Sequence, residues 1–207
     1  MGIVFGVTGV EEPAYTVLKT YQTPLYFEIR RNPQYFIAEA PMQAGENSSF
    51  SLLAKYIGVF GKPENEAAQS MAMTAPVITQ PKDSVPLAMT APVMETSDKM
   101  SFVLPFHFTD ISQIPVPKDN RVVVKAIPSK VVAVSKFRGW YSQDEGLRQF
   151  QKLAQALKDH QLVEPTADLK SLAWSVAQYH PPFTLPFFRR NEIWIEIQET
   201  AVNAERD

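Results

Sequence analysis

Cysteine is absent from this 207-residue sequence, and glycine and histidine are scarce. Without a thiol, the chain has no disulfides, no thiolate metal ligands and no cysteine nucleophile. Its eight glycines are not spaced as a phosphate-binding loop, a dinucleotide fingerprint or a nucleophile elbow, so hydrolase and kinase functions have no support. The three histidines, His107, His160 and His180, are not spaced as a metal-binding pair on a helix, and no carboxylate motif accompanies them.

Long apolar runs and blocks of basic residues are also missing. No run approaches 18 apolar residues, so no membrane insertion is expected. The net charge of −2, without a Lys/Arg block, indicates no nucleic-acid partner. Residues 1–10 are apolar but have no basic start and no clear cleavage site. We therefore expect a mature N-terminus and a soluble, cytoplasmic protein. Gly6 occupies a position where a myristoylation motif has Ser or Thr.

What the chain does have is an ordinary core composition, with 45% hydrophobic residues, and an internal repeat. We predict one domain over 1–207, with an ordered part of about 11–198 and short tails. The six residues Ala-Met-Thr-Ala-Pro-Val occur at 72–77 and again at 88–93, separated by turn-forming residues at 80–84. This pattern predicts two short strands folded back on each other, with each proline at a strand end or edge.

Alternating apolar residues predict strands at 15–21, 25–31, 35–39, 100–108, 121–126, 130–137, 173–179 and 193–198. The second and third are joined at Asn32-Pro33-Gln34, and 121–126 is paired with 130–137 through residues 127–129. A shift of 95 residues superposes Pro33 on Pro128 and one helix start on the other. We infer an internal two-fold duplication that gives an α+β fold, with a curved, mainly antiparallel sheet and two packed helices.

The two predicted helices differ in their apolar faces. The first begins at 47–49 and ends before Gly58, whereas the second begins at a predicted capping box, Ser142 with Glu145. The second has a single apolar stripe, made of Leu147, Phe150, Leu153, Ala154 and Leu157. The first has two stripes, made of Phe50, Leu53, Ala54 and Ile57 and of Leu52, Tyr56 and Val59. Either the spare apolar face meets a ligand or partner, or the N-terminal segment buries it.

Several motifs occur in a fixed order between residues 11 and 197. They are the doubled Met-Thr-Ala-Pro-Val, Tyr-Phe-Glu-Ile-Arg-Arg at 26–31, Phe-Val-Leu-Pro at 102–105, Tyr-His-Pro-Pro-Phe-Thr at 179–184 and Arg-Arg-Asn-Glu-Ile-Trp at 189–194. In these motifs the chain resembles the SOUL, or HBP, family of haem-binding proteins. The resemblance implies a distorted β-barrel with two flanking helices, and haem or another porphyrin as ligand.

The resemblance also implies a pocket between the first helix and the loop before Arg189. Its candidate residues here are Phe50, Leu53, Ala54, Lys55, Ile57, Phe183, Leu185 and Arg189, with His180 as the candidate iron ligand. Two cations that some members use to hold propionates are missing, because Asn47 and Thr184 occupy those positions. Weaker or differently oriented haem binding is therefore expected. Each residue also has a structural alternative: the aromatic residues as core, Lys55 as a solvated side chain, and residues 189–192 as a strand entry paired within the protein.

The function expected from the resemblance is a haem or tetrapyrrole carrier, buffer or sensor. One alternative is a protein-interaction module, in which the spare face of the first helix binds a partner and haem binding is incidental. Another is an enzyme that acts on tetrapyrroles in the same cavity, although no acid–base pair in the sequence favours it. The physiological ligand and the oligomeric state are left open.

Overall fold

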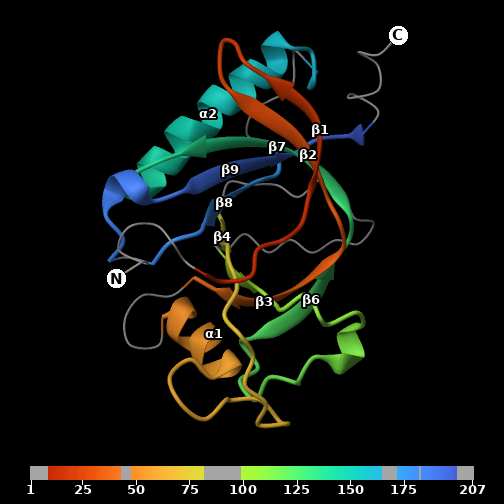
Figure 1. Ribbon diagram of the computed structural model, residues 1–207, viewed down its shortest axis with the longest axis vertical. Helices are drawn as coiled ribbons and strands as arrows, with labels where there is room; N and C mark the ends of the chain where they lie inside the picture. The colour runs from red at the N-terminus through yellow and green to blue at the C-terminus, as the bar shows by residue number, and fades with distance from the viewer. Residues whose placement is uncertain (1–8, 43–47, 82–98, 165–171, 182, 200–207) are drawn as a thin grey trace.

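The computed structural model describes residues 9–42, 48–81, 99–164, 172–181 and 183–199 (Figure 1). Two helices, α1 (Ser49–Ile57) and α2 (Gln143–Asp159), lie at opposite ends of one curled antiparallel sheet. The sheet order is β1-β2-β7-β9-β8-β4-β5-β3-β6. The strands are β1 Thr16–Tyr21, β2 Phe27–Asn32, β3 Tyr35–Pro41, β4 Val77–Gln80, β5 Lys99–Val103, β6 Val123–Ile127, β7 Lys130–Phe137, β8 Trp174–Gln178 and β9 Asn191–Glu196. The predicted fold class is thereby confirmed.

The strand order shows the internal duplication directly. Apart from the extra edge strand β1, the order β2-β7-β9-β8 is mirrored by β6-β3-β5-β4. The elements of the second repeat, β6, β7, α2, β8 and β9, follow their counterparts β2, β3, α1, β4 and β5 in the same sequence order. The two repeats meet where β4 pairs with β8 in the middle of the sheet. Each repeat contributes one helix, so each end of the sheet is covered on one face.

The proline turns bend strands and do not reverse them. β2 pairs with β7 from Glu28↔Val134 to Asn32↔Lys130, and β3 pairs with β6 in the same register from Tyr35↔Ile127 onward. Residues 27–41 and 123–137 therefore form two long bent strands that run antiparallel to each other. Pro33 and Pro128, which have no N–H to donate, lie at the bends. The predicted local pairing of 121–126 with 130–137 is therefore wrong.

The first copy of the repeated motif leads into β4. Pro76 immediately precedes the strand, as predicted, and the Thr74 hydroxyl donates to the carbonyl of Val103 on β5. Residues 77–79 pair with β5 on one side and with β8 on the other. The predicted hairpin is therefore wrong for this part of the chain, because both edges of β4 are occupied. The second copy lies outside the described residues.

The helix ends follow from local chemistry, with one exception. Ser48 caps α1, and Gly58 ends it at a φ of 87°, where a side chain would also meet Pro63. In α2 the Ser142 hydroxyl accepts from the Glu145 N–H. The Glu145 carboxylate instead accepts hydrogen bonds from the side chains of Arg148 and Gln149. Only half of the predicted capping box therefore forms.

Each helix packs on its own apolar core. The α2 core contains the predicted stripe except Leu147, which is exposed. Both predicted stripes of α1 are buried, except for Val59 and for Phe50, which is partly exposed. Leu52 and Tyr56 pack in a cluster with Phe108, Ile114 and Val122, and the Tyr56 hydroxyl donates to the carbonyl of Pro115 at 2.7 Å. The chain after β5 thus covers the spare face, and residues 1–8 of the N-terminal segment, the predicted alternative cover, lie outside the described residues.

Candidate functional site

The loop that precedes β9 folds against the segment just before α2. The Gly139 N–H donates to the carbonyl of Pro186 at 3.0 Å, and an Arg138 guanidinium nitrogen lies 3.3 Å from the carbonyl of Phe187. The Asn191 side chain donates back to the carbonyl of Gly139 at 3.0 Å. These three bonds hold the short 3₁₀ turn at 186–188 in place, beside the beginning of α2 (Figure 1).

Large apolar side chains of this loop remain in solvent. We define the loop aromatic cluster as Trp140, Phe183, Leu185, Phe187 and Phe188, whose exposed fractions are 59%, 65%, 37%, 59% and 40%. The rings of Phe187 and Phe188 lie 4.8 Å apart. Exposed apolar groups concentrated in one place are typical of surfaces that bind a ligand or a partner. The sequence prediction included Phe183 and Leu185 but missed Trp140, since it lies far away in the chain.

Arg189 links the loop to Trp140. Its guanidinium carbon lies 3.6 Å from the centre of the Trp140 ring, and its Nε donates to the carbonyl of Thr184 at 2.8 Å. Burial lowers the pKa of Arg189, which is 7% exposed, but an arginine remains charged at neutral pH. Arg138 adds a second guanidinium beside Phe187. The cluster therefore combines a flat apolar surface with two nearby cations.

The predicted residues of α1 are mostly inside the protein. Leu53, Ala54 and Ile57 are at most 2% exposed and belong to the α1 core. Phe50 is half-buried, and its ring meets Phe102 edge-on at 5.3 Å between centroids. Lys55 is also half-buried. Of the five helix residues proposed for the pocket, only Phe50 and Lys55 thus present surface to a ligand.

Lys55 lies on the side of α1 that faces the chain before β6. The hydrogen bond from Arg121 lowers the pKa of Asp119 to about 2, and the charge of Lys55 adds a smaller contribution. α1 itself packs against β3 and β5, while the loop aromatic cluster packs next to α2. The structure thus brings Phe183, Leu185 and Arg189 together in one loop and keeps Leu53, Ala54 and Ile57 in a separate core.

His180 has a defined partner on one ring nitrogen. Its Nδ1 lies 3.0 Å from the backbone N–H of Arg190 and accepts that hydrogen bond. In the neutral ring the proton is then on Nε2, whereas a histidine that binds a metal through Nε2 usually donates from Nδ1. Iron ligation by His180 would therefore require the ring to change tautomer and release Arg190. Thr184, where some family members have Lys, is 1% exposed and faces inward.

A group of hydrogen-bonded polar side chains lies buried on the inner face of the sheet. Arg30 is bonded to Glu28 at 2.7 Å and to Glu192 at 3.1 Å, and all three side chains are at most 9% exposed. Glu192 also accepts hydrogen bonds from the Tyr179 hydroxyl and the Trp194 indole, each at 2.8 Å. We call these five residues the buried polar network. The predicted alternative, that residues 189–192 pair within the protein, is confirmed for Glu192.

Local electrostatics keep this network charged and hydrogen-bonded. Burial raises the pKa of Glu28, but hydrogen bonds from Tyr26 and Arg30 outweigh it and hold the pKa below its ordinary value. Burial, and then the Glu192 carboxylate, raises the pKa of Tyr179 well above its ordinary value, so its hydroxyl remains a donor. Polar or hydrogen-bonding side chains at alternate positions of two strands, Glu28 and Arg30 on β2 with Glu192 and Trp194 on β9, were the sequence signal for this network.

The described part of the chain contains no group of three His, Cys, Asp or Glu side chains that could hold a metal ion. None of its helices is long and apolar enough to cross a bilayer.

The sequence matches the family of SOUL heme-binding proteins over residues 10–196. The chain therefore belongs to that family, as its motifs indicated, and haem binding is the property for which the family is named. A search of the curated proteins finds no significant match to the sequence.

Similar folds occur among solved structures. The C-terminal domain of EcmrR is 13% identical, with a TM-score of 0.51 over 83% of this chain and 96% of that one. EcmrR in a DNA complex gives a TM-score of 0.52 at 13% identity, over 83% of this chain and 57% of that one. A hydrolase from Listeria innocua is 10% identical, with a TM-score of 0.51 over 83% of this chain and 91% of that one. At such identities the likeness concerns the fold alone.

Proposed function

We propose that this protein binds haem or a related tetrapyrrole and acts as a soluble carrier, buffer or sensor. The observation that carries the proposal is the loop aromatic cluster, which leaves Phe183, Phe187 and Trp140 more than half exposed next to the guanidinium groups of Arg138 and Arg189. A porphyrin is a flat apolar ring with two carboxylates, so apolar walls and adjacent cations suit it. Membership of the family supports the same ligand.

In this proposal the loop supplies most of the binding surface. Phe183, Leu185 and Phe187 would cover one face of the ring, and the guanidinium groups would pair with the propionates. Phe50 and Lys55, the helix residues that reach the surface, are the remaining candidates from α1. Leu53, Ala54 and Ile57 would contribute by holding the helix in shape, unless α1 moves when the ligand binds.

The rim of this site has fewer cations than the resemblance implies. Thr184 is buried and uncharged, and Asn47 lies outside the described residues. An exposed ion pair contributes about 0–1 kcal/mol, so losing two of them weakens binding without abolishing it. Apolar contact then supplies most of the affinity. Metal-free protoporphyrin should accordingly bind almost as well as haem.

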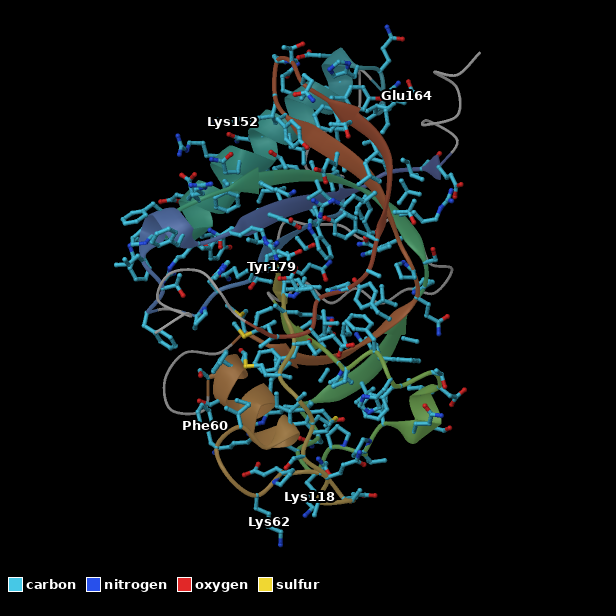
Figure 2. The ribbon with its side chains drawn as sticks, in the orientation of Figure 1. Phe60, Lys62, Lys118, Lys152, Glu164 and Tyr179 are labelled. Carbon is cyan, nitrogen blue, oxygen red and sulfur yellow. The ribbon has the colours of Figure 1, made fainter. Side chains whose placement is uncertain are left out.

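The test is a titration of the purified protein with haem, followed by its visible absorbance. We expect one saturable site with a Kd in the micromolar range or tighter, about 8 kcal/mol of binding free energy. Phe187→Ser should weaken binding by about tenfold, since removing a ring from an apolar contact costs about 1.5 kcal/mol or more. Phe60→Ser is the matched control, because Phe60 is similarly exposed (65%) but follows α1 at the far end of the molecule (Figure 2). Equal effects of the two substitutions would exclude the loop as the site.

The same surface supports a second candidate, a docking site for a protein partner. An exposed cluster of three phenylalanines, a leucine and a tryptophan is unusual on a monomer, and aromatic residues are enriched in protein interfaces. The two functions differ in what Phe187→Ser changes. If the protein forms no saturable complex with haem but self-associates or binds a partner through Phe187, the second function replaces the first.

A further inference from the structure

The segment ahead of β1 crosses the inner face of the sheet. We call residues 9–15 the N-terminal strap; in Figure 1 it runs across the middle of the view, between the α2 end and the α1 end. The carbonyl of Glu11 accepts from the Ala75 N–H at 2.9 Å, and the Glu12 carboxylate accepts from Arg190. The Tyr15 ring lies under the Arg30 guanidinium, 4.0 Å from its carbon to the ring centre. The strap therefore contacts both repeats.

Beneath the strap lies the buried polar network. Tyr179, labelled near the centre of Figure 2, donates to Glu192, and Glu192 accepts from Arg30. The guanidinium of Arg190 stacks on the Tyr179 ring, with its carbon 3.7 Å from the ring centre. Two cations thus mark the ends of one surface: Arg30 is covered by an aromatic ring, and Arg190 is paired with a carboxylate.

The strap covers this surface, but most of the strap itself remains exposed to solvent. Glu11, Glu12 and Tyr15 are exposed, and residues 9–15 form no strand with the sheet. Arg190 and Glu12 are each more than one-third exposed, so solvent screens their ion pair. The polar network below is, by contrast, buried and hydrogen-bonded within the protein. A weakly held segment over such a polar surface can be exchanged for another molecule of the same chemistry.

We propose that the inner face is a binding site for an aromatic carboxylate, and that the strap is its built-in competitor. In this proposal Tyr15 occupies the position on Arg30 that the aromatic ring of the ligand would take. Glu12 occupies the position on Arg190 that the ligand's carboxylate would take. Among the described residues the buried Nε of Arg190 has no hydrogen-bond partner, because Glu12 engages only the Nη2. A free carboxylate can accept from both nitrogens at once, as planar guanidinium and carboxylate groups favour. The site is distinct from the loop aromatic cluster and does not depend on haem binding.

The test uses the full-length chain with a weakened strap, Glu12→Gln together with Tyr15→Ser. The probe is a capped peptide with the sequence of residues 9–16, titrated by calorimetry. In the wild type the tethered strap competes at high effective concentration, so we expect the variant to bind the peptide at least about tenfold more tightly. Arg190→Gln in the variant should remove the gain. Naphthoate should displace the peptide, whereas the uncharged naphthalene alcohol should not.

Two comparisons guard against a folding artefact. Both substituted strap residues are exposed, and far-ultraviolet circular dichroism should match that of the wild type. The peptide itself can carry Glu12→Gln, which leaves the protein untouched and should weaken its binding by about tenfold. Equal peptide affinities for wild type and variant would overturn the proposal. Binding that ignores the Glu12→Gln change in the peptide, or displacement by the alcohol as well as by naphthoate, would overturn the proposed ligand class.

Discussion

Replacing Arg30 by alanine should destabilise the protein more than any exposed substitution. The Arg30 side chain is 2% exposed and lies between the carboxylates of Glu28 and Glu192, both of which are also buried. Its removal leaves two carboxylates in a low-dielectric environment without their shared cation. Breaking a buried ion pair in this way costs about 3–5 kcal/mol of unfolding free energy. With a urea m-value of about 2 kcal/mol/M, the midpoint should fall by about 1.5–2.5 M.

Arg31 supplies the matched control, because it is the next residue on the same strand. Its side chain is 43% exposed and pairs with Glu199, which is 54% exposed. Arg31→Ala should therefore cost about 0–1 kcal/mol. Urea unfolding monitored by circular dichroism measures both variants under the same conditions. If Arg30→Ala costs no more than Arg31→Ala, the buried polar network does not stabilise the fold as described.

The pH dependence of the Arg30→Ala defect gives a second check. In the wild type, Glu28 has a folded pKa below its ordinary value of 4.5, so its contribution is present above that pH and is lost as pH falls through the folded pKa. Without Arg30, burial should raise the pKa of the carboxylates above their unfolded values. Such groups take up protons on folding, so the deficit relative to wild type should shrink as pH falls toward about 5. A deficit that grows at lower pH would contradict this.

Three further predictions concern the α1 face, the iron ligand and an acidic turn. Phe50→Asp should weaken haem binding more than Lys55→Ala, since a charge in an apolar wall costs more than the ~1 kcal/mol of a rim ion pair. Circular dichroism must show that the Phe50→Asp variant folds. Normal haem binding by the folded variant would exclude this face of α1 as part of the site. His180→Ala should leave the visible bands of the ferric complex unchanged, because Nδ1 already accepts from Arg190; shifted bands with severalfold weaker binding would instead establish His180 as the ligand. Asp119→Asn should lower the unfolding free energy by at most about 1 kcal/mol at pH 7, since the pair with Arg121 is partly exposed. Because the folded pKa of Asp119 is about 2, against an ordinary 3.8, that difference should be present above pH 4 and vanish as pH falls through 2, as followed by thermal unfolding.

Local features of the fold could be predicted from the sequence because they depend on near neighbours. Ser48 and Gly58 delimit α1 by capping chemistry, and alternation predicted every described strand except β4, which was expected only from the repeated motif. Pairing could not be predicted in the same way, since it depends on residues far apart in the chain. A proline turn has the same sequence pattern whether the strand reverses direction or only bends. At Pro33 and Pro128 the strand bends.

The candidate site was predictable only in part, for the same reason. Phe183, Leu185 and Arg189 are neighbours in sequence and remain together in one loop. Trp140 joins them through tertiary contacts, which the spacing of residues in the sequence does not predict. The two stripes of α1 indicated spare apolar surface, but the sequence does not show that the chain after β5 folds back over the second stripe. Burial of Arg30 was hidden because charged residues are exposed by default.

The two bent strands have a consequence for how the protein folds. β2 belongs to the first repeat but pairs with β7 beside α2, while β6 belongs to the second repeat but pairs with β3 beside α1. Each repeat thus contributes one strand to the half of the sheet formed by the other repeat, as the two subunits exchange elements in a domain-swapped dimer. Neither repeat can complete its own sheet, so we expect both to lose their amide protection in hydrogen exchange together. A single repeat on its own would need a second copy to complete its sheet, so the duplicated chain supplies within one molecule the two copies that a homodimer would otherwise provide.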